Sequence, residues 1–216
     1  MTYEVIKRII DILASIFLLI LFSPILLAAG VAIRLSSVGP ILVEKDNSHM
    51  KRFTKGGKIF RLYKFRSMRV NADMLLEKDP KFKKHYELYK KSGFKLHEDP
   101  RVMRVGKFIR KHSVDEMPQL FNVLKGEMSL VGPRPYLPKE LDEQQGKYPN
   151  TRGYVKEMLT VKPGITGFWQ VSGRSNVGFE KRIEMDAYYA RKKSLFLDFL
   201  IMLKTPWIMV SGTGAV

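Results

Sequence analysis

The sequence ILASIFLLILFSPILLAAGVAI, which occupies residues 12–33, runs for 22 residues without a charged side chain and decides how the rest of the chain is interpreted. As a helix, this stretch would be about 33 Å long, close to the thickness of the hydrocarbon core of a bilayer. The apolar segment of a cleavable signal peptide is shorter, at about 7–15 residues. The length therefore favours a membrane-associated helix over a signal peptide or the buried helix of a globular protein.

Ser23 and Pro24 interrupt this stretch near its middle. Proline removes a backbone donor and clashes with the preceding turn, so the helix is predicted to kink there. A kinked helix either spans the bilayer or bends back and leaves both of its ends on one side. Lys7 and Arg8 precede the stretch and Arg34 follows it. Because basic residues tend to stay on the cytoplasmic side, this distribution favours the second alternative only slightly.

Composition narrows the class of protein and of partner. The 216 residues suffice for one domain, and a hydrophobic fraction of 45% excludes global disorder. The absence of cysteine excludes a disulfide-stabilised fold, cysteine-ligated zinc, an iron–sulfur cluster and thiol catalysis. Residues 1–34 carry a net charge of +1, which leaves +16 of the total +17 on residues 35–216. This excess predicts an anionic partner, which is nucleic acid, an anionic membrane surface or a phosphorylated substrate.

The chain is thus predicted to consist of a membrane anchor, residues 1–34, and a basic body, residues 35–216. In the body, Gly56-Gly57 lies between Phe53 and the stretch 59–65, which predicts a β-hairpin. Residues 180–193 have an apolar stripe at helical spacing, and residues 195–205 are apolar almost all round, as in a helix that lies in a core or against lipid. The predicted fold class is α+β and mostly helical, with amphipathic helices at the membrane interface and a small hairpin or sheet.

Adjacent carboxylates are the first candidate for chemistry. Ser113 and Glu116 have the spacing of a capping box, which predicts that a helix starts here, with Asp115 and Glu116 in its first turn. The helix dipole, Arg110 and Lys111 would favour the ionised carboxylates. An ionised carboxylate is a nucleophile towards phosphorus or a ligand for magnesium. The alternative is that these acids are ordinary partners of the dipole.

Two proline- and glycine-rich segments follow. Gly126 is predicted to end the helix that starts at Ser113, and Pro133 and Pro135 then hold the backbone around Arg134 stiff and extended. A rigid loop with a projecting arginine suits the recognition of phosphate or nucleotide. The segment 162–174, KPGITGFWQVSGR, combines glycines, a serine and Arg174, as in a mobile loop that closes on phosphate. A surface turn is the alternative for both segments.

Basic and aromatic residues alternate from Tyr63 to Met68, with Lys64 and Arg66 as the cations. This alternation is typical of a strand with one packed and one cationic face. It also suits single-stranded nucleic acid, an alternative that the membrane anchor makes less favourable.

Together these segments resemble the bacterial sugar transferase family, the monotopic polyprenyl-phosphate phosphoglycosyltransferases. The resemblance covers nearly the whole chain, and the ordered set of motifs is more specific than any one of them. The ending SGTGAV resembles a branch of hexose-1-phosphate transferases, which favours UDP-galactose or UDP-glucose as the donor. Larger members have further N-terminal segments, so the chain resembles the minimal catalytic form. The motifs are Lys7-Arg8, the apolar stretch with Ser23-Pro24, KFRSM at 64–68, SVDEMPQL at 113–120, NVLKGEMS at 122–129, VGPRP at 131–135, KPGITG at 162–167 and WQVSGR at 169–174.

The resemblance implies an enzyme that transfers a sugar 1-phosphate from a UDP-sugar to undecaprenyl phosphate, through an aspartyl phosphosugar intermediate and with release of UMP. It implies that the Ser-Pro helix is re-entrant and returns to the cytoplasmic face of the bacterial inner membrane, in contact with anionic phospholipids. Ser23 would then bind a backbone carbonyl while Pro24 makes the bend, and Lys7 and Arg8 would bind lipid headgroups. No nucleic acid is expected as a partner, and a homodimer stays open.

The resemblance also assigns roles to single residues. Asp115 would be the nucleophile, and Glu116 would help to hold Mg²⁺, for which both carboxylates are candidate ligands. The residues expected to bind substrate are Arg110, Pro133, Arg134, Pro135, Arg174, Lys64 and Arg66. Two alternatives to the enzyme are a membrane-tethered nucleic-acid-binding protein and a catalytically silent scaffold that binds UDP-sugars.

Overall fold

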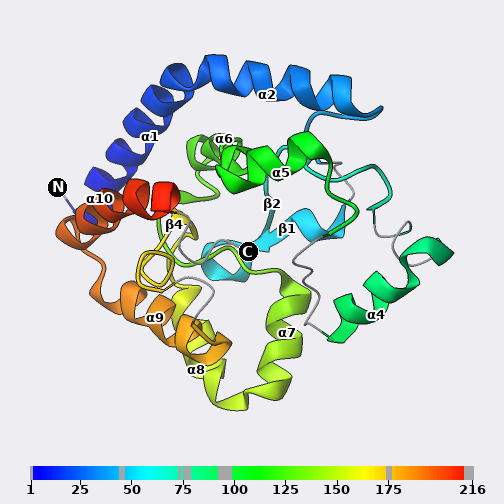
Figure 1. Ribbon diagram of the computed structural model, residues 1–216. Helices are drawn as coiled ribbons and strands as arrows, with labels where there is room; N and C mark the ends of the chain where they lie inside the picture. The colour runs from blue at the N-terminus through cyan, green and yellow to red at the C-terminus, as the bar shows by residue number, and fades with distance from the viewer. Residues whose placement is uncertain are drawn as a thin grey trace.

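The computed structural model describes residues 2–43, 47–72, 74, 79–91, 99–173 and 177–211. Helices dominate these residues, as predicted, and the strands are three residues long (Figure 1). The α-helices are α1 (Tyr3–Leu21), α2 (Ser23–Ser36), α4 (Lys83–Lys91), α5 (Arg104–Lys111), α6 (Gln119–Lys125), α7 (Pro138–Lys147), α8 (Arg152–Met158), α9 (Phe179–Lys192) and α10 (Leu195–Ser211). The strands are β1 (Lys51–Phe53), β2 (Ile59–Arg61), β3 (Ser129–Val131) and β4 (Gly164–Thr166), and short 3₁₀ turns are η1 (Ser48–Met50), η2 (Lys55–Gly57), η3 (Pro80–Phe82), η4 (Val114–Glu116) and η5 (Pro149–Thr151).

The N-terminal apolar stretch forms a bent pair of helices, α1 and α2, along one edge of the molecule (Figure 1). The bend of 62° lies at Phe22, directly before Ser23-Pro24. The Ser23 hydroxyl donates a hydrogen bond of 2.8 Å to the Ile20 carbonyl, which proline leaves without its usual backbone donor. Within the described residues, no single helix has the length and apolarity of a membrane span, but this bent pair has them together.

One face of α1 and α2 packs against the body, and the other is exposed. Ala14, Leu18 and Leu19 of α1 join a core that α6, β3 and α9 also build, whereas Ala29 and Ile33 of α2 pack with residues of α5. On the outer face, large apolar side chains are exposed, among them Leu13, Phe17, Ile20, Leu27 and Leu35. The pair is therefore integrated with the body on one side and presents an apolar surface on the other.

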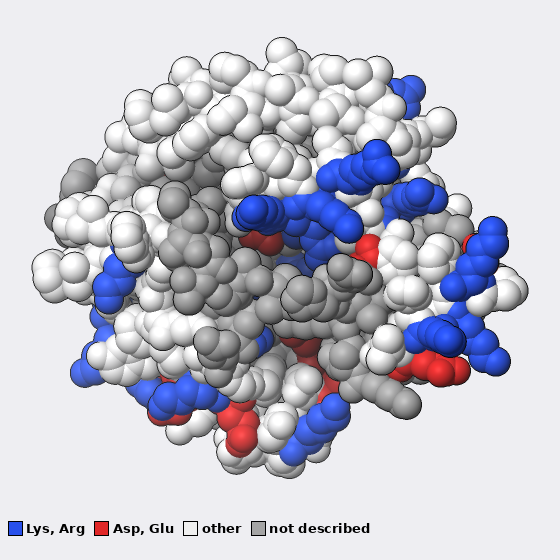
Figure 2. Space-filling model, in the orientation of Figure 1, with Lys and Arg blue, Asp and Glu red and all other residues white. Residues whose placement is uncertain are grey.

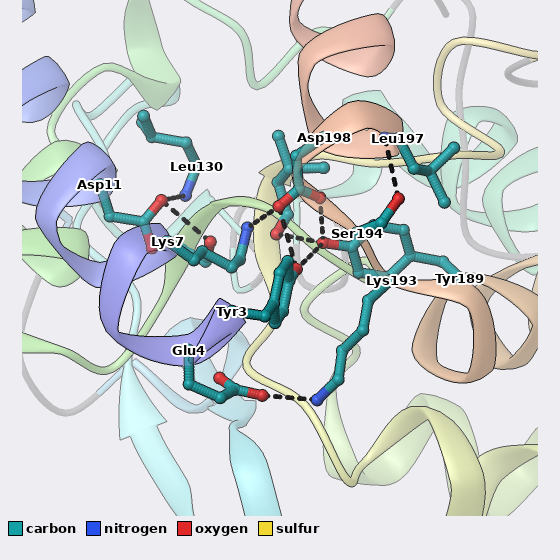
Figure 3. A network of polar contacts seen from close by, with 12 residues as sticks. Tyr3, Glu4, Lys7, Asp11, Leu130, Tyr189, Lys193, Ser194, Leu197 and Asp198 are labelled. Atoms are coloured by element: carbon teal, nitrogen blue, oxygen red, sulfur yellow. Dashed lines mark hydrogen bonds and ion pairs between the residues drawn. The ribbon is translucent and has the colours of Figure 1, made fainter. Parts of the chain in front are cut away.

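Polar contacts hold the first half of α1 against the body (Figure 3). The buried Asp11 carboxylate accepts hydrogen bonds of 3.0 Å from both the Ser129 hydroxyl and the Leu130 backbone N–H. Lys7 forms an ion pair of 2.8 Å with the buried Asp198 of α10. Asp198 also accepts a hydrogen bond from Tyr189 of α9. This network fixes the position of α1 relative to β3, α9 and α10.

Lys7 and Arg8, which were expected to bind lipid headgroups, both have partners within the protein. Lys7 is paired with Asp198, and the Arg8 guanidinium donates to the carbonyls of Val123 and Leu124, at 2.6 and 2.8 Å. The last carbonyls of a helix have no partner within the helix, and a cation there also complements the dipole. Arg8 therefore caps α6 instead of facing away from the protein.

Two small sheets complete the fold. The predicted hairpin is present: β1 and β2 pair antiparallel, with Phe53 opposite Ile59, and Gly56 and Gly57 supply the positive φ angles of the turn. The second sheet is a parallel pair of β3 and β4, which the sequence analysis did not predict. Its backbones approach so closely that a Cβ atom at Gly132 or Gly164 would clash with the facing main chain.

This parallel pair corrects the interpretation of the segment 162–174. Gly164 is paired with Ser129, and a Cβ atom at Gly167 would clash with Gly132. These glycines allow β3, the residues after it and β4 to approach closely, a packing role that the sequence analysis did not assign to them. Arg174, the residue expected to act in that loop, lies outside the described residues.

The two predicted C-terminal helices are present as α9 and α10. Ile183, Ala187 and Ala190 of α9 are buried, in line with the predicted stripe. On α10, Ile201 is buried, but Phe196, Phe199 and Leu203 are exposed, as is Trp207. Helix α10 lies beside α1 in Figure 1, so the molecule presents apolar side chains on both.

Candidate active site

The adjacent carboxylates Asp115 and Glu116 lie in a 3₁₀ turn, η4, and not in the first turn of an α-helix. Ser113 has a left-handed backbone conformation, with φ at 55°, and its side chain makes no capping hydrogen bond. Helix α6 begins later, at Gln119, and ends at Gly126 as predicted. The predicted capping box is therefore wrong, because a residue in the left-handed conformation cannot direct its hydroxyl at the N–H three residues on in the usual way.

Replacement of Ser113 by glycine tests this correction. Glycine adopts a φ of 55° without strain, so Ser113→Gly is expected to leave stability unchanged or to raise it by about 1 kcal/mol. Loss of a real N-cap would instead lower stability by about 1 kcal/mol. Thermal unfolding of the purified variant and its parent distinguishes these results, with Ser113→Ala as the variant in which the strain remains.

Lys64 brings the two carboxylates into one charged cluster. Its Nζ lies 3.0 Å from Asp115 Oδ2 and 3.2 Å from Glu116 Oε1. The side chain of Asp115 is 3% exposed, whereas that of Glu116 is 43% exposed. The buried carboxylate thus faces a cation, and the second carboxylate opens towards solvent.

Main-chain contacts place Lys64 beside the acids. The Phe65 N–H donates to the Asp115 carbonyl at 2.9 Å, so the segment after β2 runs directly along η4. The fully buried Asn122 of α6 accepts from the Tyr63 N–H at 2.9 Å and donates to the Arg61 carbonyl at 2.7 Å. Asn122 therefore provides hydrogen-bond partners for the backbone groups on both sides of Leu62, and it fixes the position of the segment that carries Lys64.

Asn122→Ala is expected to destabilise the protein by about 3 kcal/mol, because it leaves the partly buried Tyr63 N–H and Arg61 carbonyl without their partner. For a chain of this size, such a loss lowers the Tm by about 6–12 °C. The control is Asn150→Ala, since Asn150 is exposed and its side chain donates to Glu180 on the surface. An equal Tm for the two variants would contradict the role assigned to Asn122.

The environment of the cluster shifts the pKa values of the two carboxyl groups in opposite directions. Burial raises the pKa of Asp115 above its ordinary value, and the Lys64 ammonium opposes this effect. Lys64 lowers the pKa of Glu116, with further lowering by Arg134 and Arg52. Burial alone would lower the pKa of Lys64, but Glu116 and Asp115 together raise it, so Lys64 is charged at neutral pH. The sequence analysis expected a helix dipole to favour the ionised form of Asp115. In the structure, the Lys64 ammonium has this effect instead.

The loop that contains Pro133, Arg134 and Pro135 follows β3 and is fixed at several points. The Pro133 carbonyl accepts from the Gly164 N–H at 2.8 Å. The Arg134 N–H faces the buried Asp186 carboxylate at 3.4 Å, and burial raises the pKa of that carboxyl well above its ordinary value. The Arg134 guanidinium is exposed and lies 5.9 Å from the Trp169 ring centre. The prediction of a rigid loop with a projecting arginine therefore agrees with the geometry.

Two other predicted site residues, Arg110 and Arg66, lie in different environments. Arg110 is exposed at the end of α5 and lowers the pKa of Asp115. Arg66 is buried, and its guanidinium binds the carbonyls of Ser37, Val38 and Pro40. The expectation that Arg66 binds substrate is therefore wrong: it holds the chain that leaves α2.

Arg52 is a candidate that the sequence analysis did not single out. It lies on β1, next to the loop of Arg134, because the Phe53 N–H donates to the Tyr136 carbonyl. Burial and the like charge of Arg134 lower the pKa of Arg52 to about 10. The excess of basic residues in 51–70 was the only signal in the sequence, and it did not distinguish Arg52 from its neighbours.

Basic side chains surround this region of the surface. Figure 2 shows Lys and Arg gathered over the part of the molecule where Figure 1 draws α5, beside a hollow in which acidic side chains are visible. The exposed cations of α5 are Arg104, Lys107, Arg110 and Lys111. A phosphorylated ligand that approached the carboxylates from this side would meet positive potential.

The two carboxylates are suitable ligands for a Mg²⁺ ion whose coordination shell is completed by substrate oxygens. Mg²⁺ in phosphate-transfer sites is held by one or two carboxylates together with substrate oxygens. One oxygen of Asp115 and one of Glu116 lie 3.0 and 3.2 Å from Lys64 Nζ, so the two carboxylates face the same side. Within the described residues, no group of three or more His, Asp and Glu forms a complete metal cage. The donor set therefore suits a metal that enters with a phosphorylated substrate.

Comparison with known proteins supports the resemblance. The family described as bacterial sugar transferase matches residues 2–212. The chain is 41% identical to an undecaprenyl-phosphate galactose phosphotransferase of Salmonella typhimurium, over 97% of this chain and 41% of that protein. It is also 41% identical to a UDP-N-acetylgalactosamine-undecaprenyl-phosphate N-acetylgalactosaminephosphotransferase of Aeromonas hydrophila, over 99% of this chain and 45% of that protein.

A shorter relative is the exopolysaccharide production protein ExoY of Rhizobium meliloti, with 38% identity over 92% of this chain and 83% of that protein. The chain thus spans less than half the length of the Salmonella and Aeromonas proteins and most of the length of ExoY. The family match at residues 2–212 includes the bent helix pair, the carboxylate cluster and the loop of Arg134. The chain belongs to the bacterial sugar transferase family.

Proposed function

We propose that the protein transfers a sugar 1-phosphate from a UDP-sugar to undecaprenyl phosphate, as a membrane step in the synthesis of a bacterial glycoconjugate. The observation that carries the proposal is the Asp115–Lys64–Glu116 cluster, a buried carboxylate held against a cation at a basic surface. Relatives named as undecaprenyl-phosphate phosphotransferases support it.

In the first step, an Asp115 carboxylate oxygen attacks the phosphorus that bears the sugar. A bond forms between this oxygen and phosphorus, the bond from phosphorus to the bridging oxygen breaks, and UMP leaves. In the second step, a phosphate oxygen of undecaprenyl phosphate attacks the same phosphorus and releases the Asp115 carboxylate. The lipid then carries a diphosphate-linked sugar.

The surrounding residues stabilise charge in both steps. The Lys64 ammonium keeps Asp115 ionised before attack and compensates the charge that gathers on the phosphoryl oxygens. Arg110, Arg134 and Arg52 offer guanidinium groups to the diphosphate and the nucleotide, with Pro133 and Pro135 setting the shape of the loop. Mg²⁺ held by Asp115 and Glu116 would offset the repulsion between the anionic nucleophile and the anionic substrate.

We also propose that the bent pair α1–α2 is a re-entrant anchor in the cytoplasmic face of the inner membrane. The exposed apolar side chains of α1, α2 and α10, together with Phe108 and Phe121, would lie in the lipid or at its surface. A lipid acceptor requires the nucleophile close to the interface, and an anchor of this kind would hold it there. A nucleic-acid-binding protein is not favoured, because the relatives are sugar transferases.

The test is release of UMP by the protein in nanodiscs that contain Mg²⁺ and undecaprenyl phosphate, with a panel of UDP-sugars that includes galactose, glucose and their N-acetylated forms. UMP that depends on both the lipid and one sugar is the expected result. Binding of a UDP-sugar without UMP release would support the silent scaffold instead.

A further inference from the structure

A second cluster of cations lies at the opposite end of α6 from the carboxylates. It lines a cavity between the first turns of α1, the turn of the β1–β2 hairpin and the segment before β4 (Figure 3 labels Tyr3, Glu4, Lys7 and Asp11 of α1). The cavity is distinct from the Asp115 cluster, which precedes the N-terminal end of α6. Its charged walls are formed by Glu4, Lys7, Arg8, Asp11, Lys55, Lys162 and Lys193.

Three of these cations, Arg8, Lys55 and Lys162, have no anionic partner among the described residues. Lys193 is paired with Glu4, and Lys7 with Asp198. In the described part of the chain, Lys55 and Lys162 form neither an ion pair nor a side-chain hydrogen bond, and Arg8 contacts only neutral carbonyls. After the buried Asp11 is counted, the cavity keeps a net charge of about +2.

The geometry brings the unpartnered cations together. A Cβ atom added at Gly126 would lie 3.5 Å from both an Arg8 guanidinium nitrogen and Lys162 Nζ, so these cations face each other across that glycine. Burial and the like charges of Arg8 and Lys55 lower the pKa of Lys162. Like charges held at one cavity cost free energy that a bound anion would recover.

We propose that this cavity binds a phosphate monoester group, with Lys55 and Lys162 as its principal ligands and Arg8 as a fixed cation behind them. A phosphate monoester carries a charge close to −2 at neutral pH, which matches the net charge of the cavity. Two sources have this chemistry, a free phosphate and the headgroup of a lipid such as phosphatidic acid. Lys55 is exposed at the edge of the cavity, and Val5 and Ile9 of the adjoining α1 are exposed apolar residues, so both sources are alternatives for this site.

The proposal does not rest on the proposed enzymatic activity, and its test uses no turnover. The whole protein, labelled with ¹³C at the lysine ε-carbons, is titrated with inorganic phosphate in phosphatidylcholine nanodiscs, and the Lys162 signal is assigned from Lys162→Arg. The expected result is a saturable shift of the Lys162 signal. The Lys64 signal reports separately on phosphate at the carboxylate cluster.

The Lys55→Ala/Lys162→Ala variant is expected to lose this site, with phosphate binding at the remaining lysine signals of the cavity weakened about tenfold or more. Lys58→Ala and Lys156→Ala are the matched controls, because both lysines are exposed and lie outside the cavity. Their binding is expected to equal that of the parent.

Nanodiscs with phosphatidic acid separate the two sources. A Lys162 shift in these discs before phosphate is added identifies the lipid headgroup, and a shift only after addition identifies free phosphate; either result supports the site. The proposal is overturned if the Lys162 signal responds to neither, or if sodium chloride of equal ionic strength gives the same shift.

Discussion

Asp115→Asn is expected to lower the rate of UMP release by at least about a thousandfold at saturating Mg²⁺ and lipid. The amide has no anionic oxygen to attack phosphorus, but it has nearly the same shape as the carboxylate and keeps a neutral acceptor for Lys64. The fold should therefore survive, and a loss of rate would report on chemistry. The measurement is UMP release together with a thermal unfolding curve for each variant.

Two comparisons sharpen this result. Asp142→Asn removes the charge of an exposed aspartate on α7 and is expected to leave the rate unchanged. Glu116→Gln is expected to reduce the rate less than Asp115→Asn, because Glu116 would supply charge and metal ligation but not the nucleophilic oxygen. With a UDP-sugar radiolabelled in the sugar, only proteins that retain Asp115 should form a covalent adduct in the absence of lipid acceptor. An adduct in Asp115→Asn would refute the assignment of the nucleophile.

The parts of the fold that are set by neighbouring residues were predictable from the sequence. The Gly56-Gly57 turn, the helix end at Gly126 and the kink at Pro24 each follow from the backbone preferences of one or two residues. The stripe of α9 follows from helical periodicity in the same way. These predictions hold because the local preference and the tertiary structure require the same conformation.

Features that depend on contacts between distant segments were not predictable in this way. Ser113 and Glu116 have the spacing of a capping box, but the contacts of η4 with the segment at Lys64 place Ser113 in a left-handed conformation instead. The parallel pair of β3 and β4 joins two three-residue strands whose glycines suggested loops. Nothing in their local sequence states that one packs against the other.

The roles of the arginines also depend on contacts between distant segments, so the sequence did not predict them. Arg66 and Arg8 were assigned to ligands, yet both donate to carbonyls where helices α2 and α6 end. Such carbonyls need donors, and a sequence does not reveal which of many basic residues turns inward. Lys64 was likewise expected to bind substrate, and the structure places it in contact with both carboxylates.

Lys64→Met is expected to be the second most damaging substitution, with kcat/KM at neutral pH reduced about a hundredfold or more. It removes the cation that stabilises two carboxylates and leaves Asp115 buried without a charged partner. Since Lys64 lowers the pKa of Asp115, its loss raises that pKa further. The ionised form needed for attack then requires a higher pH, so the acid limb of the pH–rate profile should move towards alkaline pH.

Lys64→Arg separates charge from shape. Arginine keeps the positive charge, so the acid limb should stay close to that of the parent even if the bulkier guanidinium lowers the rate. Lys58→Met, at an exposed lysine ahead of β2, should change neither the rate nor the profile. An acid limb that stays in place in Lys64→Met would mean that burial alone sets the ionisation of Asp115. Lys64 would then act on the substrate phosphate and not on the nucleophile, because a contact made only with the substrate changes the rate without moving the titration of the free enzyme.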